Sequence, residues 1–294
     1  MNAIRTVGFV GLGAMGLPMA MALLARNFVV QGYDVRAQAR EALVRAGGLE
    51  SVTAAGSAAG ADVLVLMVVN ATQAEEVLFA AGSLDALPAH GTVILMSTCP
   101  PAGVAAIAAR VSTAGRRFVD APVSGGVAGA RTARLTIMAA GPGADVEAVR
   151  PVLAAMGQRI FHVGETPGQG AMVKSVNQLL CGAHIAIAAE ALALAAKLGL
   201  DGQMLLEVMG GSGAASWILN DRGPRMLQAE PEVTSTVDIF VKDLGIVMQA
   251  GRDAKAALPM AAIAHQLFLS VSGRGAGAAD DSQVIRAYHA LNGT

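Results

Sequence analysis

The chain has 294 residues, of which 54% are hydrophobic and 15% charged, and its net charge is −1. This composition predicts a large core and excludes an intrinsically disordered chain. The near-neutral charge, the lack of a basic run and an aromatic content of 3% argue against nucleic acid as a partner. The length suits two domains or one large α/β domain.

The first expected element is a short apolar β-type run, residues 7–10, that ends in the glycine-rich turn GLGAMG. The first glycine permits a tight turn, the second lets backbone approach a phosphate, and the third lets the next helix pack closely on the strand. The helix expected at 17–26 would direct its N-terminal amides at an anion. The pattern therefore predicts a pyrophosphate site, with an unliganded turn as the alternative. The predicted cofactor-binding residues of this turn are Gly11, Leu12, Gly13, Ala14, Met15 and Gly16.

A second expected strand, residues 28–34, ends in Asp34. An acid at this distance from a glycine-rich turn is placed to accept hydrogen bonds from a ribose diol, and its charge would repel a 2′-phosphate. Arg36 lies two residues further on, but we expect the carboxylate to dominate. The sequence therefore predicts NAD as the cofactor.

Short β-type runs alternate with helical patterns through the first half, as in a doubly wound parallel sheet. This alternation predicts a Rossmann-type domain over residues 1–166. Further strands are expected at 62–69, 92–96, 117–120, 134–140 and 159–163, and helices at 36–46, at 71–79 and from Pro100 and Pro101 onward.

From about residue 168 the strand signals end. A long Ala/Leu-rich helix is expected at 170–199, and the rest of the chain reads as helical, which predicts an all-helical substrate and oligomerisation domain over 167–294. The one flexible-looking stretch is GRGAGAADD at 273–281. The shorter helices are expected at 201–210, 214–228, 236–254, 258–272 and 281–291.

Cysteine and histidine placement indicates a reduced protein without a metal site. Cys99 and Cys181 form no C-x-x-C pair, and the five histidines show no metal-ligand spacing. Met1 is followed almost at once by the first strand, and the apolar stretch at 179–199 contains charged residues, so a buried helix is expected there rather than a membrane span. These features predict a cytoplasmic protein.

Three segments of the chain carry the residues expected to do chemistry. Ser124, Gly125 and Gly126 follow a strand-like run and would expose amides to a carboxylate, although an ordinary tight turn fits equally. Lys174 lies early on the long apolar helix, with Asn177 and Gln178 one turn on and on the same face.

Burial would lower the pKa of a lysine amine at position 174, because the charged form loses hydration, and a nearby oxidised nicotinamide would act in the same direction. Such an amine can serve as a general base near neutral pH. The alternative is a lysine whose amine reaches out to water. Lys242 and Asp243 form another charged pair in an apolar helical pattern, which suits either a domain interface or closure over a cofactor.

Four segments in this order resemble the 3-hydroxyacid (β-hydroxyacid) dehydrogenase family. They are GFVGLGAMGLPMA at 8–20, DAPVSGG at 120–126, GQGAMVKSVNQ at 168–178 and FVKDL at 240–244. Within the family, the stretches at 68–79, 177–200 and 235–247 look most like the L-threonate dehydrogenase subgroup. The resemblance covers nearly the whole chain.

The resemblance implies a role for each matching residue. Lys174 matches the lysine that takes the hydroxyl proton during oxidation and returns it during reduction. Ser124, Gly125 and Gly126 match the substrate-carboxylate loop. Asn177 and Gln178 match the pair that positions substrate, where many members have two asparagines. The cofactor contacts implied by the resemblance are Val69, Asn70, Thr98 and Lys242.

The resemblance also implies an NAD-dependent dehydrogenase for a small hydroxy acid, best matched by L-threonate oxidised to its 2-keto acid. The alternatives are a 3-hydroxyisobutyrate dehydrogenase, an NAD(P)H-dependent reductase of tartronate or succinic semialdehyde, and a non-catalytic dinucleotide-binding protein. Family members form dimers and tetramers through the helical domain, so a homodimer or homotetramer is expected.

Overall fold

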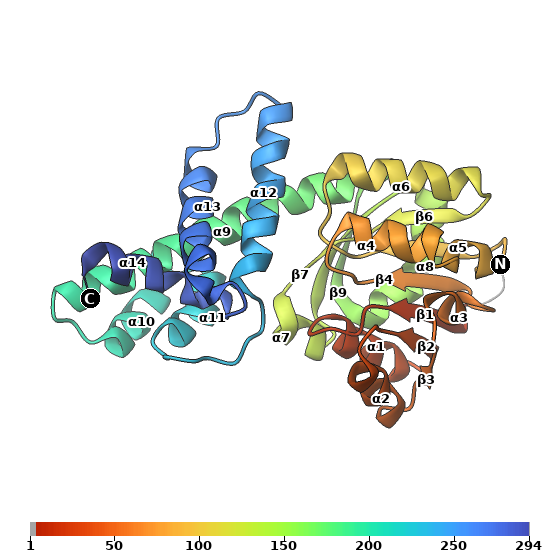
Figure 1. Cartoon of the computed structure of the whole chain (residues 1–294), viewed down its shortest axis with the longest axis horizontal. Coiled ribbons are helices and arrows are strands. Elements are labelled where there is room, and N and C mark those ends of the chain that lie inside the picture. The colour runs from red at the N-terminus through yellow and green to blue at the C-terminus, as the bar shows by residue number, and fades with distance from the viewer. Residues whose placement is uncertain (1–3, 294) are drawn as a thin grey trace. The chain divides into compact units, whose positions relative to one another are not determined.

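The structure is a computed structural model that describes residues 4–293. The chain forms two compact units, Met1–Lys174 and Ser175–Thr294. The first is an α/β unit and the second is helical (Figure 1). The predicted boundary at 166/167 precedes the long helix α9 (Gln169–Lys197), whereas the units divide inside it.

A nine-stranded sheet forms the centre of the α/β unit, in the order β3-β2-β1-β4-β5-β6-β8-β7, with β9 paired to β8. The strands from β3 to β6 are parallel, β8 is antiparallel to β6 and β7, and β9 is parallel to β8. The strands are β1 (Thr6–Val10), β2 (Val29–Tyr33), β3 (Leu49–Glu50), β4 (Val63–Leu66), β5 (Thr92–Leu95), β6 (Arg117–Asp120), β7 (Val123–Ser124), β8 (Leu135–Ala140) and β9 (Gly157–Gly164).

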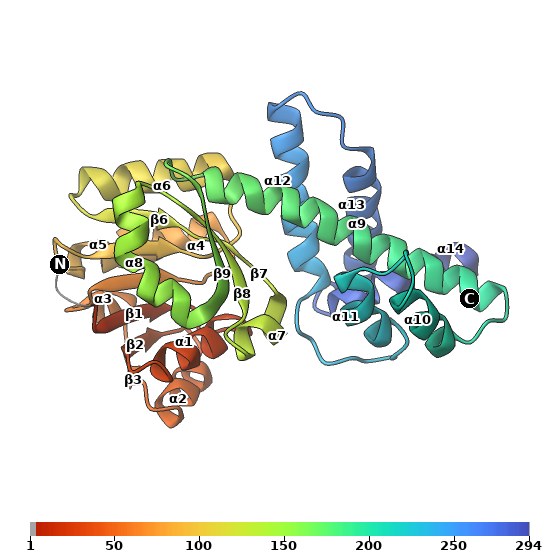
Figure 2. The ribbon, with the colours of Figure 1, turned by 180° about the vertical axis from the view of Figure 1, so that it is seen from behind.

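Helices cover both faces of this sheet, which explains why β4 and β5 are buried at every position (Figures 1 and 2). One core contains side chains of α1 (Gly16–Leu24), α2 (Ala37–Arg45), α7 (Gly126–Arg131) and α8 (Gly143–Met156). The other contains side chains of α3 (Ala54–Ala58), α4 (Ala71–Glu75), α5 (Ser83–Ala86) and α6 (Pro101–Thr113).

Strand β1 lies between β2 and β4, so the chain winds outward from β1 in both directions. At such a switch point the loops that leave neighbouring strands diverge, and ligands bind in the resulting crevice at the carboxyl ends of the strands. The glycine-rich turn follows β1, and Val69 and Asn70 follow β4. The sheet order therefore places both predicted cofactor segments at one edge.

The helical unit consists of the rest of α9 and a series of shorter helices. Side chains just before three of these helices cap them: Asp201 accepts from Met204 N–H, Ser216 from Leu219 N–H, and Thr236 from Ile239 N–H. The helices and helical turns that follow α9 are α10 (Gly202–Gly210), α11 (Trp217–Met226), α12 (Val237–Asp253), α13 (Pro259–Val271), the π-helical turn Ser272–Ala276, the 3-10 turn Asp281–Val284 and α14 (Ile285–Asn292).

Buried ion pairs hold the glycine-rich stretch 273–281 onto α11. The guanidinium of Arg222 donates to both carboxylate oxygens of Asp281, at 3.1 and 3.0 Å, and Arg225 Nη1 donates to Asp280 Oδ2 at 2.8 Å. Both aspartates are buried. The composition of this stretch suggested flexibility, but its acidic end is fixed by partners about 55 residues away in sequence, which local composition does not encode.

Most predicted elements match the structure within a few residues. The helix expected at 71–79 becomes π-helical from Glu76 to Ala80. The helices α3, α5, α7 and α8 and the two-residue strands β3 and β7 were not predicted. Helix α9 is long and apolar enough to cross a bilayer by length and composition, and 44% of its most apolar window is buried inside the protein.

Candidate active site

The turn after β1 has the close backbone packing that its glycines predict. A Cβ added to Gly16 would lie 1.8 Å from the carbonyl oxygen of Gly11, and one added to Gly11 would lie 2.4 Å from that of Met67. Gly11 also has φ +95°, which favours glycine. A Cβ on Gly13 would lie 3.8 Å from its nearest neighbour, Arg36 Nη2, so only the tip of a flexible side chain lies near this residue and no backbone crowds it.

The uncrowded backbone at Gly13 and the start of α1 at Gly16 together form a cradle that a pyrophosphate fits. The first-turn amides of a helix have no intrahelical acceptor and carry the positive end of the helix dipole. The residues of the glycine turn could hold a dinucleotide here, and their role as cofactor contacts stays a prediction.

Asp34 lies directly after β2, and its carboxylate is buried beside the glycine turn. Oδ2 accepts the Leu12 N–H at 2.8 Å, and Oδ1 accepts the Arg36 N–H at 2.9 Å. The Arg36 guanidinium adds bonds at 3.0 Å to Oδ1 and 3.2 Å to Oδ2. Burial acts to raise the pKa of Asp34, but the hydrogen bonds from Arg36 and Leu12 outweigh it and lower the pKa.

The other predicted cofactor contacts of this unit lie in the loops after β4 and β5. Val69 is exposed, and its N–H donates to Gln73 Oε1 at 2.9 Å. Asn70 caps α4, with Oδ1 accepting the Gln73 N–H at 2.9 Å. Thr98 follows β5, the strand next to β4, and is half-buried. Strand adjacency thus brings these loops to the edge that carries the glycine turn.

The segment Ser124, Gly125 and Gly126 joins a short strand to a helix. Ser124 ends β7 and is paired with Thr136 of β8, whereas Gly125 and Gly126 have φ of +124° and +60°. All three residues are half-buried. Two successive positive φ angles direct the backbone along a path that other residues rarely adopt. Glycine adopts such angles without strain, so the corner between β7 and α7 depends on glycine at both positions. Whether this segment binds a carboxylate or is only a turn stays a prediction.

Asp120 is a residue that the motif analysis did not single out as functional. It ends β6 and is fully buried, and its Oδ2 accepts the N–H groups of Gly168 and Ala171 at 3.0 and 2.9 Å. Oδ1 has no hydrogen-bond partner among the described residues. Burial raises the pKa of Asp120 to about 6, although the hydrogen bonds from the amides of Ala171, Gly168 and Gly170 oppose this.

Asp120 therefore caps the start of α9 from a distance of 48 residues in sequence. The local sequence before α9, Thr166-Pro167-Gly168, provides no side-chain cap for the Ala171 amide. This missing local cap is the sequence feature that could have pointed to a capping residue elsewhere in the chain. The Asp120 carboxylate also lies so close to the helix that residue 170 must be glycine, since a Cβ added there would lie 2.9 Å from Asp120 Oδ2. Lys174 follows one turn later and is buried.

On the helical unit, four polar residues of α9 and α12 form one group, joined by two hydrogen bonds and an ion pair. Gln178 Nε2 donates to Asp243 Oδ2 at 2.5 Å, and Asn177 Nδ2 donates to Gln178 Oε1 at 2.9 Å. Lys242 Nζ lies 2.7 Å from Asp243 Oδ1. Gln178 and Asp243 are buried. Asp243 was noted in the sequence only as the neighbour of Lys242, yet it connects both predicted site segments of this unit.

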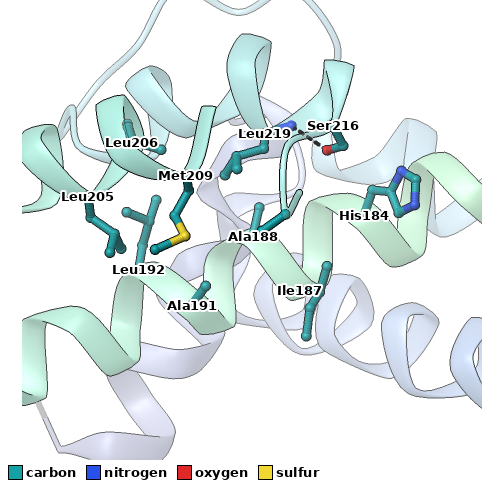
Figure 3. Close-up of a pocket in the computed structure, with 11 residues that line it drawn as sticks. His184, Ile187, Ala188, Ala191, Leu192, Leu205, Leu206, Met209, Ser216 and Leu219 are labelled. Carbon is teal, nitrogen blue, oxygen red and sulfur yellow. Dashed lines mark hydrogen bonds between the residues drawn. The ribbon is translucent and has the colours of Figure 1, made fainter. Parts of the chain in front are cut away.

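One cavity of about 170 Å³ lies elsewhere in the helical unit, between α9, α10 and α11 (Figure 3). Its walls are apolar apart from His184 and Ser216, whose hydroxyl caps α11. None of the predicted site residues lines it. Within residues 4–293 no group of three or more histidine, cysteine or acidic side chains could hold a metal ion.

Asp120→Asn should make the stability difference from the wild type depend on pH. Between pH 6 and 3.8 the folded carboxyl binds a proton that the unfolded one releases, so wild-type stability from this group rises as the pH falls through that window. Across this window the free energy of unfolding of the wild type should rise relative to that of the variant by about 3 kcal/mol, since one pKa unit corresponds to about 1.4 kcal/mol. Urea unfolding at pH 7, 5.5 and 4.5 measures it. Asp85→Asn, on the surface, is the control, and a flat difference for Asp120→Asn would contradict the assignment.

Comparison with known families matches both units. The model of the NAD binding domain of 6-phosphogluconate dehydrogenase matches residues 6–164. The model described as NAD-binding of NADP-dependent 3-hydroxyisobutyrate dehydrogenase matches residues 168–288. Together they span nearly the whole chain.

Individual relatives align over their full length. L-threonate dehydrogenase of Cupriavidus necator is 40% identical, covering 97% of this chain and 96% of its own. 2-(Hydroxymethyl)glutarate dehydrogenase of Eubacterium barkeri is 36% identical, covering 98% and 96%. The crystal structure of 3-hydroxyisobutyrate dehydrogenase from Salmonella typhimurium has a TM-score of 0.92 at 37% identity, covering 96% and 99%. This chain belongs to the 3-hydroxyacid dehydrogenase family and is a hydroxyacid dehydrogenase that uses a nicotinamide dinucleotide.

Proposed function

We propose that this protein oxidises L-threonate at C2 to the 2-keto acid, with NAD as hydride acceptor, in the cytoplasm. Five relatives named L-threonate dehydrogenase, 36–40% identical over at least 97% of this chain, support the substrate. The buried Asp34 carboxylate supports NAD, because its charge repels a 2′-phosphate.

The observation that carries the proposal is the buried amine of Lys174, one turn into a helix whose first amides are fixed by Asp120. When bound, NAD accepts the hydride from the carbon that bears the hydroxyl. Lys174 Nζ takes the hydroxyl proton, and the same amine as an ammonium returns it in reduction. Ser124 and the amides of Gly125 and Gly126 hold the substrate carboxylate, and Asn177 and Gln178 orient the hydroxyl end.

Substrate choice is tested by initial rates of NAD reduction with L-threonate, D-glycerate, L-serine, 3-hydroxyisobutyrate and 4-hydroxybutyrate. We expect kcat/KM to be highest for L-threonate. Product analysis should show a ketone at C2, the carbon whose hydroxyl the proposed reaction oxidises, and a ketone at C3 would contradict that position. A preference for a 3-hydroxy acid would contradict L-threonate as the substrate but would leave the family assignment unchanged. Activity only with NADH and tartronate or succinic semialdehyde would favour the reductase alternative.

Lys174→Ala should lower kcat about 10²- to 10⁴-fold, the usual size of a general acid–base contribution. NAD affinity, measured by quenching of intrinsic fluorescence or by calorimetry, should stay within about threefold, because the predicted dinucleotide contacts lie elsewhere. Lys197→Ala removes the same charge from the exposed end of the same helix and is the control. Turnover of the Lys174 variant within a few-fold of wild type would end the general-base assignment.

We also propose that the helical unit self-associates through α9. Exposed apolar side chains recur at heptad spacing on this helix, at Leu180, Ile187 and Leu194, with Val176 and Leu198 continuing the same face. A stripe at this spacing suits packing against another helix. A second copy of the chain is the partner proposed, because an identical stripe supplies an equally long apolar face for antiparallel or parallel pairing.

Light scattering after size exclusion should give a dimer or tetramer for the wild type at about 50 μM, a typical loading concentration for weak homo-oligomers. The double variant Ile187→Glu, Leu194→Glu should run as a monomer with unchanged circular dichroism, since both side chains are exposed. Met260→Glu, on α13, is a matched control for an exposed apolar-to-acid change. A monomeric wild type would refute the proposal.

A further inference from the structure

The exposed apolar stripe of α9 is symmetric about Ile187. Leu180 and Leu194 lie seven residues before and after Ile187, and Val176 and Leu198 lie eleven before and after it. All five side chains are more than half exposed. Seven and eleven residues are close to two and three whole turns of an α-helix, so the five side chains share one face. The stripe therefore has the same spacing from either end of the helix.

The residues between these apolar positions follow the same symmetry. His184 and Glu190 lie three residues before and after Ile187, and Ala183 and Ala191 lie four before and after it. A twofold axis beside Ile187 that pairs α9 with a reversed copy brings His184 of one copy and Glu190 of the other into the same layer of the interface. The remaining members of that layer are alanines, which leave room for the longer side chains to reach across it.

Both polar side chains have capacity for such a contact. His184 is half-buried and makes no hydrogen bond or ion pair with any residue in the range 4–293. Glu190 is exposed, and its Oε2 accepts the Tyr288 hydroxyl at 2.9 Å. The other carboxylate oxygen can accept from a histidine of a second copy, and a charged donor or acceptor strengthens such a bond.

A parallel pairing of the same stripe lacks this complementarity. With the two helices in register and pointing the same way, each residue shares a layer with its own counterpart. Glu190 then lies near a second Glu190, and His184 near a second His184. Like charges placed together at an interface disfavour that arrangement, whereas opposite charges favour the reversed one.

We infer that two copies of this chain pair through α9 in antiparallel orientation, with the twofold axis beside Ile187. This inference rests on the self-association proposed above and specifies its geometry. Leu180 of each copy packs on Leu194 of the other, Val176 lies near Leu198, and Ile187 contacts its own counterpart. The interface is isologous, so it closes as a dimer and does not propagate into a filament.

Cysteine cross-linking of the whole chain tests this geometry. A disulfide needs two Cα atoms within about 7 Å of each other. Under mild oxidation, Ile187→Cys should form a covalent dimer on non-reducing electrophoresis. Leu180→Cys and Leu194→Cys should each stay unlinked, because equal positions lie about 21 Å apart at 1.5 Å per residue. A re-equilibrated mixture of these last two variants should cross-link.

The background for these variants is Cys181→Ser, because the native thiol at position 181 would lie close to residue 194 of the second copy. The other native thiol, Cys99, is buried. The Cys181→Ser protein without an added cysteine is the control and should give no covalent dimer. Circular dichroism of each variant should match that of the wild type, since the three substituted side chains are exposed.

Charge exchange across the proposed layer provides a second test. His184→Glu should raise the dimer Kd at least about threefold, because two symmetry-related contacts become repulsive. Adding Glu190→Lys should return the Kd to within about twofold of wild type, which also shows that the first variant folds. Gln203→Glu adds the same charge to an exposed position of α10 and should leave the Kd unchanged. Sedimentation equilibrium measures all four proteins.

Cross-linking of Leu180→Cys or Leu194→Cys alone would indicate a parallel pairing and overturn the inference. A dimer without a cross-link at Ile187, or without one in the mixture, would overturn it too, as would failure of Glu190→Lys to restore association. A monomeric wild type would refute the proposed self-association together with its geometry.

Discussion

The burial of one carboxylate, that of Asp120, fixes where the long helix of this protein begins. Its Oδ2 accepts amides at both ends of the turn that opens α9, and Gln169 adds a local contact by accepting the Thr166 N–H. The charge is removed from water to do this, which is why burial raises the pKa of Asp120. The position of Lys174 relative to the sheet follows from this contact, since a helix is rigid over a single turn.

The glycine turn after β1 also fixes where a helix begins, but it does so through close backbone packing rather than through a buried carboxylate. Gly16 and Gly11 touch backbone so closely that no side chain fits, whereas no backbone crowds Gly13. Two glycines thus serve the packing of the strand against its helix and one serves the approach of a ligand.

Patterns with a local physical cause were predicted well. The glycine turn, Asp34, the parallel strands and the long apolar helix each follow from short-range sequence, and the order of motifs identified the family. Asp120 and Asp243 were not identified as site residues because their partners lie 48 and 65 residues away, at Gly168 and Gln178. The two hydrogen bonds from the Arg36 guanidinium to the Asp34 carboxylate could not be predicted from the sequence either, since they depend on how a side chain folds back on its own loop.

The buried arginine–aspartate pairs around α11 have a consequence for the response to heat. Hydration of charged groups becomes less favourable as temperature rises, so the penalty for burying Arg222 with Asp281 shrinks on warming while the attraction between them persists. Apolar burial has no comparable gain per unit area at high temperature. The ion pairs between the 273–281 stretch and α11 therefore contribute more to the stability of the helical unit as the temperature rises.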